Sequence, residues 1–185
     1  RDERYGLMEH MTRELARSSR YREEVDAWSI VNNAFSTSFA GFDASKSLCS
    51  TSHVGLDGTT RANRPSVDIG LSVTAIQGMV TRFRRMTNQR GLPMNMAPAM
   101  LIIAPEQLFT AREVLGSSGA PYKTDNEINS VVPEGLRYFS TPYKTSTTSW
   151  LALAKKGEHD LNFMYRDRPM FDSWDDPTTK NAVFS

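Results

Sequence analysis

The first part of the chain carries an amphipathic helical pattern from Gly6 to about Phe35. Arginines and glutamates separate its apolar residues, as on the solvent-facing side of a helix. About 30 residues is well above the length of a typical globular helix, and Ser18-Ser19 offers a place for a kink or a break. The pattern predicts a long helix that packs along one side against a sheet or a second helix. The apolar residues recur at steps of three and four: Leu7, Met8, Met11, Leu15, Tyr21, Val25, Trp28, Val31 and Phe35.

Turn-forming residues follow this helix, and little apolar sequence accompanies them. Residues 36–46 predict a loop. Residues 47–70 hold glycines and a proline among Ser, Thr, Asn and Asp, which supply turn geometry but little core. One short strand is predicted here, from Leu48 to Val54.

The centre of the chain predicts two helices around one buried strand. Helical spacing returns from Leu71 to Met86, and Gly78 within it predicts close packing against a neighbour. Met100 to Ile103 is wholly apolar, which predicts a strand buried on both faces. Pro105 fits the first turn of a second helix, and Gly116 ends that helix.

The last third predicts strands separated by polar turns. They are expected at Leu136–Phe139, Trp150–Leu153 and Leu161–Tyr165, with Lys155–Glu158 as a hairpin connection between the last two. The chain shows no repeat at a fixed period and no low-complexity linker. We therefore expect an α+β fold, with a mixed sheet against two helices and no independent domains.

Composition narrows the class of protein. Hydrophobic residues make up 39% of the 185 residues and charged residues 23%, as in an ordinary globular protein. The 22 basic and 21 acidic residues leave almost no net charge, whereas a dedicated nucleic-acid binder is usually more basic. No apolar run approaches the roughly 20 residues that span a bilayer, and Arg1 does not begin a signal peptide. We expect synthesis in a reducing cytoplasm and, because Arg1 is not Met, further segments at one or both ends.

Cys49 and His53 are the first candidates for site chemistry. The single cysteine excludes an intrachain disulfide, and a structural zinc usually needs four ligands, so two residues at this spacing predict no metal site. The favoured interpretation is that Cys49 is a small buried hydrophobic residue and His53 a hydrogen-bonded turn residue. The sequence predicts no cofactor.

Nucleophilic catalysis has no clear basis either. Ser52-His53 with Asp57, or Cys49 with His53, contains suitable residue types, but neighbours on a strand point to opposite faces. No Gly-x-Ser-x-Gly turn accompanies them. His10 and His159 fall in polar surroundings that indicate solvated side chains. We predict no catalytic residue.

Two groups of arginines are candidate contacts with DNA or with other subunits. Phosphate contact needs only basic side chains on an exposed face, but the glutamates interspersed along the first helix are more typical of a solvated or subunit-contacting face. Nucleic-acid motifs such as an aromatic platform, zinc-finger spacing or a phosphate loop are missing from the sequence. The candidates are Arg13, Arg17 and Arg20 in the first group and Arg82, Arg84 and Arg85 in the second.

Two tracts resemble the Mu-like major head subunits among the tailed-phage major capsid proteins. Leu48 to Asn63, Leu-Cys-Ser-Thr-Ser-His-Val-Gly-Leu-Asp-Gly-Thr-Thr-Arg-Ala-Asn, is similar to the Ser-Thr-Ser-His segment, Gly-rich turn and Asn that follow that group's spine helix. Met94 to Leu108 is similar to its Pro-x-x-Leu-apolar-apolar-x-Pro-x-x-Leu entry from a strand into a helix. With Tyr138-Phe139 and Ser149–Leu153, the resemblance covers most of the chain.

The resemblance implies the Hong Kong 97-type capsid fold, with a peripheral P domain and an axial A domain. Residues 1–66 would supply the spine helix and part of the P domain, 67–155 the A domain, and 156–185 returning P-domain strands. Loops at Ser117–Gly119 and around Asn126 and Pro133 would approach the symmetry axis. The extended N-terminal arm and hairpin loop that precede the spine helix in that group are missing from these residues, and no motif supports crosslinking between subunits.

The resemblance also implies a structural function in the virion. Such subunits assemble in the host cytoplasm into hexamers and pentamers of an icosahedral shell around double-stranded DNA. The chain itself is then the main partner, with packaged DNA touched non-specifically and portal, scaffold or decoration proteins as further partners, and no membrane is involved. The alternatives are a generic oligomeric scaffold protein, or a hydrolase that uses His53 or His159.

Overall fold

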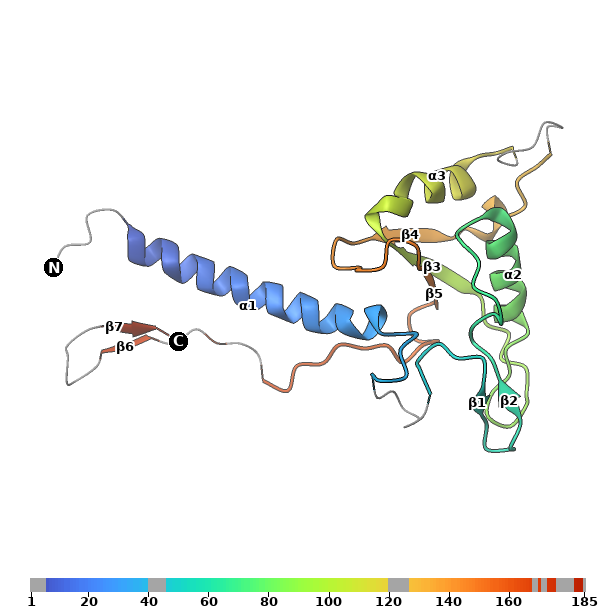
Figure 1. The fold of residues 1–185 in the computed structure, drawn as a ribbon, viewed down its shortest axis with the longest axis horizontal. Helices are drawn as coiled ribbons and strands as arrows, with labels where there is room; N and C mark the ends of the chain where they lie inside the picture. The colour runs from blue at the N-terminus through green and yellow to red at the C-terminus, as the bar shows by residue number, and fades with distance from the viewer. Residues whose placement is uncertain are drawn as a thin grey trace. The chain divides into compact units, whose positions relative to one another are not determined.

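The computed structural model describes residues 6–39, 46–119, 127–167, 170, 173–175 and 182–184. The chain forms two compact units, labelled by element in Figure 1. The smaller unit comprises Arg1–Ser29 and Asn162–Ser185, and the larger comprises Ile30–Leu161. Among the described residues, no helix is both long enough and apolar enough to cross a membrane.

A single long helix passes from the smaller unit into the larger one. α1 spans Leu7–Asn32 and continues through Ser18-Ser19, so the option of a break at that pair is wrong. The Ser18 hydroxyl donates to the Leu15 carbonyl at 2.8 Å, which satisfies the side chain within the helix. The rest of the smaller unit includes a two-stranded antiparallel sheet, β6 (Ser173–Asp175) with β7 (Ala182–Phe184).

The larger unit is built on a three-stranded mixed sheet. β3 (Pro98–Ile103) lies at its centre, β4 (Arg137–Ser140) pairs with it in parallel and β5 (Leu151–Ala154) pairs with it antiparallel. The predicted mixed sheet is therefore confirmed. The strand predicted at Leu161–Tyr165 does not form, because the chain leaves the sheet after the turn at Lys155–His159.

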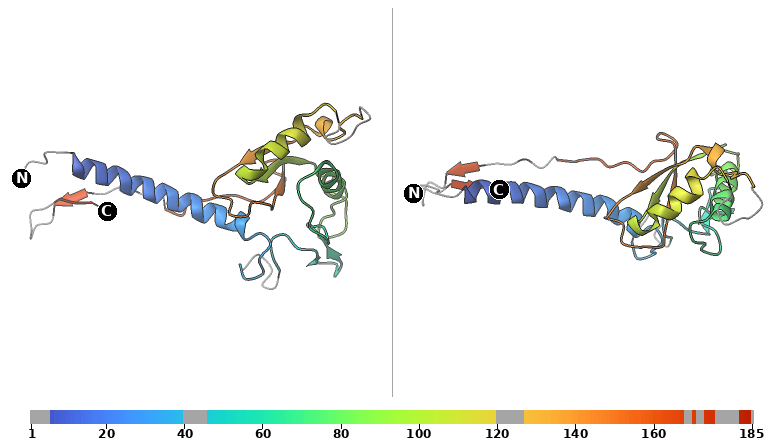
Figure 2. Two further views of the ribbon diagram at one scale, coloured as in Figure 1. Left: turned by 45° about the horizontal axis from the view of Figure 1, so that its top comes forward. Right: turned by 90° about the horizontal axis from the view of Figure 1, so that it is seen from above.

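Two helices pack on one face of this sheet. α2 spans Val73–Arg84 and α3 spans Leu108–Gly116, with a 3₁₀ turn, η1 (Pro105–Gln107), before α3. Leu101 and Ile103 of β3 point to the same face because side chains alternate along a strand. They form one buried cluster with Ile76 and Val80 of α2, Ala111 and Val114 of α3, and Val131. Figure 2 shows the arrangement from two further sides.

The opposite face of β3 is also covered. Ile102 points away from the cluster and is nonetheless buried, as are Val31 in the last turn of α1 and Ala34 just after the helix. Asn32 attaches this end of the helix to the loop before β5: its side-chain nitrogen donates to the Tyr143 carbonyl at 2.8 Å, and its oxygen accepts from the Thr145 amide at 3.1 Å. The prediction of a strand buried on both faces is confirmed.

Local departures from the predicted elements have local causes. α2 begins after Ser72, whose hydroxyl accepts from the Ala75 amide, and it ends at Arg84 instead of Met86. A tight turn follows, in which Thr87 pairs with Pro93. Of the strand predicted at Leu48–Val54, only β1 (His53–Val54) forms, paired with β2 (Thr60–Arg61). A second 3₁₀ turn, η2, spans Val132–Glu134.

Gly78 does not serve the close packing that the sequence predicted. A Cβ atom added at this position would meet no atom within 4 Å. The face of α2 at Gly78 is therefore open.

Candidate interaction surfaces

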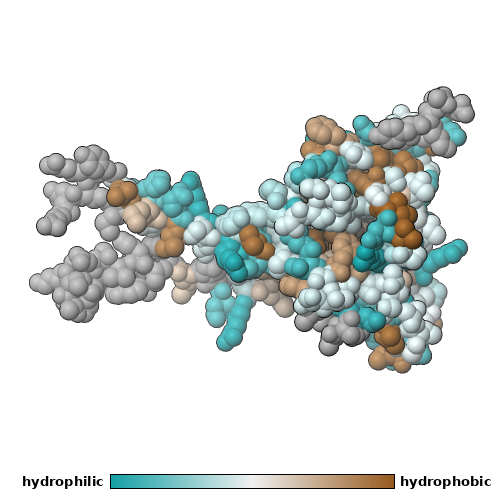
Figure 3. Space-filling model, in the orientation of Figure 1, coloured by the Kyte–Doolittle hydropathy of each residue, from teal (hydrophilic) through white to brown (hydrophobic). Residues whose placement is uncertain are grey.

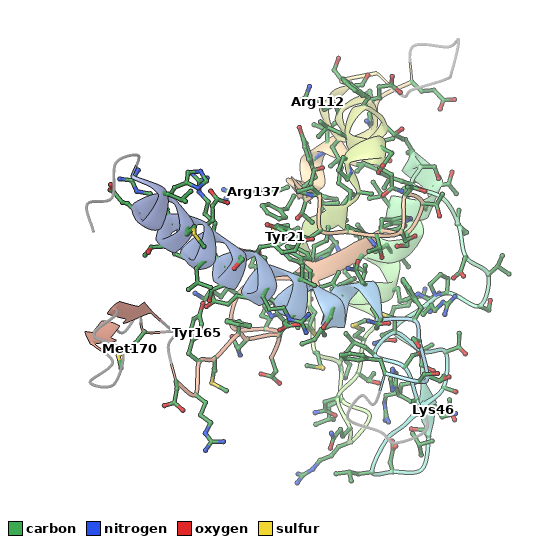
Figure 4. All side chains as sticks on the ribbon, turned by 60° about the vertical axis from the view of Figure 1, so that its left-hand side comes forward. Tyr21, Lys46, Arg112, Arg137, Tyr165 and Met170 are labelled. Carbon is green, nitrogen blue, oxygen red and sulfur yellow. The ribbon has the colours of Figure 1, made fainter. Side chains whose placement is uncertain are left out.

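Asn63 organises the tract that follows α1. Its side-chain oxygen accepts from the Ser50 amide at 2.7 Å, and its nitrogen donates to the Leu48 carbonyl at 2.8 Å. Its own amide donates to the Ser50 carbonyl at 3.1 Å. Lys46, marked in Figure 4, donates to the Ser52 hydroxyl at 3.0 Å. The Ser-Thr-Ser-His tract is thus an irregular segment that side chains hold in place.

Arg64 joins three parts of the larger unit. Its guanidinium forms a two-pronged ion pair with Asp68 and lies over the Phe35 ring at 4.7 Å from the ring centroid. The Arg64 carbonyl accepts from Nη1 of Arg82 at 3.2 Å. The ion pair raises the pKa of Arg64 and lowers that of Asp68. Because the planar guanidinium matches the carboxylate, this contact fixes the segment between β2 and α2.

A groove of about 660 Å³ opens beside this segment. One wall is α2, a second is β5 with the residue before it, and a third is the chain from Asn63 to Gly70. The indole nitrogen of Trp150 donates to the Ile69 carbonyl at 3.0 Å, which ties the second wall to the third. Figure 3 shows apolar side chains among polar ones on the surface of the part that holds the sheet. The residues that line the groove are mostly apolar, among them Phe35, Ala75, Met79, Phe83, Leu151 and Leu153.

The three arginines predicted as one cluster on α2 separate into different surroundings. Arg84 forms an ion pair with Glu134, its Nη2 lying 3.0 and 2.9 Å from the two carboxylate oxygens, so its charge is compensated. Arg82 faces the groove and also a second hollow, which it shares with Arg85 and His53. Arg85 has no ion-pair partner among the described residues. Two of the three charges therefore remain available to a partner.

The arginines of α1 differ from one another in the same way. Arg13 pairs with Glu9 and Arg17 with Glu14, at 2.5 and 2.7 Å. Arg20 has no ion-pair partner in the part of the chain that the structure describes. Exposed pairs of this kind contribute little to stability because water screens them. Arg20 therefore carries a charge that is available to a neighbouring molecule, whereas Arg13 and Arg17 are paired.

The candidate catalytic residues do not form a catalytic arrangement. Cys49 and His159 line the groove, whereas His53 lines the second hollow. Burial raises the pKa of the Cys49 thiol, an effect that Arg64 partly opposes, so the reactive thiolate is disfavoured. No group of three His, Cys, Asp or Glu side chains among the described residues is placed to hold a metal ion.

Comparison with known proteins identifies the class of protein to which the chain belongs. The family model described as phage capsid protein matches residues 1–185, the whole chain. The chain belongs to the phage capsid protein family. No curated protein and no solved structure matches it.

As a member of this family, the capsid protein is a structural component of the virion and not an enzyme. The prediction of a structural, non-enzymatic function is confirmed, and the alternative of a hydrolase using His53 or His159 is wrong. The mixed α and β architecture of the larger unit is compatible with such a protein.

Two surfaces of the capsid protein were missed from sequence. The groove could not be predicted without knowing which strand lies at the edge of the sheet. Gly78 inside a helical pattern was nevertheless a local signal of it. The second surface is an apolar tip formed by the β1–β2 hairpin and the turn after α2. Its members are exposed, namely Val54, Leu56, Leu92 and Met94. Alternation alone does not distinguish such residues from core residues.

Proposed function

We propose that this capsid protein is a major head subunit of the Mu-like group with the Hong Kong 97-type fold. It assembles into hexamers and pentamers that close an icosahedral shell around double-stranded DNA. The family match over the whole chain carries this proposal. The order of elements supports it: a long helix, an irregular crossing, a helix–strand–helix centre and later strands.

Within this proposal, residues 1–66 hold the spine helix, 67–155 form the axial domain and 156–185 return to the peripheral domain. The Ser117–Gly119 segment and the turn at Pro133 are the proposed elements near the symmetry axis. Asn126, proposed for the same role, lies outside the described residues.

Assembly from copies is supported by the apolar surface of α1. Leu7, Met11 and Leu15 recur at four-residue steps along one face and are 47–62% exposed. A helix gains most of its stability in a protein from packing of such a face. Closed symmetry repeats each contact around a ring, so an interface of modest area suffices. The same argument favours other copies of the chain as the main partner.

DNA is proposed as a non-specific partner inside the shell. The arginine candidates Arg20, Arg82 and Arg85 carry charges that no acidic side chain among the described residues compensates. Contact with phosphate requires no sequence recognition. Portal, scaffold and decoration proteins are further proposed partners, and assembly is proposed to take place in the host cytoplasm.

The test is to express the complete reading frame and examine the purified product by electron microscopy and by light-scattering mass. Shells, or hexameric and pentameric capsomers, are the expected products. A small closed ring that never forms a shell would favour the generic scaffold alternative. A monomer or dimer at every salt and protein concentration would overturn the proposal.

A further inference from the structure

The groove runs along the free edge of the sheet. β5 is an outer strand, since the order of the sheet is β4-β3-β5. A hollow on one face of a strand touches every second residue, because side chains alternate between faces. The groove instead touches five residues in succession, Trp150, Leu151, Ala152, Leu153 and Ala154. It therefore follows the edge, where alternate N–H and C=O groups of β5 point away from β3.

This edge has room for another segment. The space at Gly78 is open, and no strand in the described part of the chain pairs with the outer side of β5. An unpaired edge strand is a template for pairing with another chain, and natural proteins usually block it with charges, proline or a covering segment. Leu151–Ala154 contains neither charge nor proline.

Another segment of the same chain has the sequence of a strand but does not form one. Leu161-Asn-Phe-Met164 has the composition of a strand, yet it forms no strand pairing in the described part of the chain. Leu161, Phe163 and Met164 are 38%, 56% and 85% exposed. Disagreement between local sequence preference and the fold of one chain is expected at functional sites, of which a contact with a partner is one kind.

We propose that Leu161–Met164 of a second copy adds as a strand to the outer edge of β5, with its apolar side chains in the groove. The inference rests on the proposed function, which supplies neighbouring copies. Each segment has four residues, about 13 Å of strand, so the lengths match. Main-chain hydrogen bonds then supply affinity, and the apolar walls supply specificity.

Charge in the lining of the groove favours the same occupant. Arg82 lines the groove, and its guanidinium donates to a carbonyl, with no carboxylate partner among the described residues. Asp160 directly precedes the proposed strand and is likewise without an ion pair in the described part of the chain. The two charges are complementary between copies.

Cys49, the single cysteine of the chain, lines the groove and provides a direct test. Wild-type protein is mixed with Cys49→Ser chains that carry Phe163→Cys or Met164→Cys, and the mixture is oxidised during assembly. A disulfide between the two kinds of chain is necessarily intermolecular. Adjacent residues of a strand face opposite ways, so we expect one of the two variants to form at least about tenfold more mixed disulfide than the other.

Met170→Cys in the Cys49→Ser background is the matched control, since Met170 is 87% exposed and lies outside the segment (Figure 4). It should form little mixed disulfide with Cys49. If both segment variants react no more than this control, the proposal is overturned. Mass spectrometry of the linked peptides identifies the pair.

A second test fills the groove. Gly78→Leu places a side chain in the open space, whereas Gly116→Leu does so at the end of α3, also with no atom within 4 Å of the added Cβ. Both should fold, but only Gly78→Leu should abolish the mixed disulfide; unchanged linkage in that variant would contradict the proposal.

Normal shells without linkage would overturn this inference alone, and linked dimers that never form shells would overturn the proposed function alone.

Discussion

Arg61 binds Asp57 through both of its terminal nitrogens. Nη1 donates to Oδ1 at 2.9 Å and Nη2 to Oδ2 at 2.5 Å, while Nε donates to the Thr87 hydroxyl at 2.9 Å. The β1–β2 hairpin is therefore attached to the turn after α2. The hydrogen bonds from Arg61, and then those from Thr59, hold the pKa of Asp57 far below its ordinary value.

Replacing this carboxylate should remove an acid-dependent part of the stability. Because the pKa of Asp57 is lower in the folded state than the ordinary 3.8, its contribution is present above about pH 4 and is lost as the pH falls further. We expect Asp57→Asn to lower the urea midpoint at about pH 6 and to flatten its fall toward about pH 3. Asp160→Asn is the control, and curves for Asp57→Asn and wild type that remain parallel across this range would contradict the assignment.

Gly55 leaves the space that the Arg61 guanidinium occupies. A Cβ atom at this position would lie 1.8 Å from Nη1 of Arg61 and 2.8 Å from Oδ1 of Asp57. The flexible arginine must move away, so Gly55→Ala should reproduce the pH profile of Asp57→Asn although both charged residues remain. Gly70→Ala, where an added Cβ meets nothing within 4 Å, should keep the wild-type profile. A wild-type profile for Gly55→Ala would show that the pair re-forms in another geometry.

Elements with a strong period were predictable, because burial of one face imposes that period. α1, α2 and α3 follow the three- and four-residue spacing of their apolar residues, and β3 follows an unbroken apolar run. Leu161–Tyr165 has the same strand character as β5, but a strand also needs an available edge. The fold of the whole chain decides which segment pairs with the edge of the sheet. For that reason the prediction of a strand at Leu161–Tyr165 failed.

The contact surfaces were less predictable for a related reason. Arg82, Arg84 and Arg85 look equivalent in sequence, yet Glu134, 50 residues away from Arg84, compensates that one alone. Likewise the groove exists because β5 is the outer strand of the sheet in the described part of the chain. Long-range partners decide both features, and Gly78 is the one local signal of either in the sequence.

Asn129 should be among the polar residues on which the larger unit depends most. It is 1% exposed; its nitrogen donates to the Val114 and Ser117 carbonyls and its oxygen accepts from the Val131 amide. Asn129→Ala leaves these buried groups without partners, which should cost about 2–4 kcal/mol of unfolding free energy. Asn88→Ala, which removes two similar but exposed contacts, should cost about 1 kcal/mol or less in the same urea titration. Equal losses would contradict the dependence on burial.

The arginines of α1 should matter for assembly and little for folding. Reversing Arg13, Arg17 and Arg20 together to Glu breaks two exposed pairs, which should change the unfolding free energy by about 1 kcal/mol or less. The yield of particles should fall at least about tenfold, because the sign of a contact surface is inverted. Arg22→Glu, which breaks the exposed pair with Asp26, controls for loss of an ion pair. Normal particles from the triple variant would remove this face from the proposed contacts.

Lys144 should give the protein a stability that rises with pH. The residue is 5% exposed, its ammonium donates to the Ser149 hydroxyl at 2.5 Å, and burial lowers its pKa below the ordinary 10.5. Between the folded and the unfolded pKa, the unfolded state binds more protons, so raising the pH through this interval favours the folded state. At neutral pH the burial penalty is present in full.

Lys144→Met removes this titration and keeps a side chain of similar length. We expect the stability of the wild type, measured by urea unfolding from about pH 7 to about pH 10, to increase relative to that of Lys144→Met. Cys49 titrates in both proteins, and its raised pKa lowers the stability of both above about pH 9, so the difference between them isolates the lysine. Lys156→Met, which removes an exposed lysine, should leave the pH dependence of the wild type unchanged. If the difference between wild type and Lys144→Met is independent of pH, Lys144 is charged and solvated in the folded protein, and the loop before β5 opens more than its burial indicates.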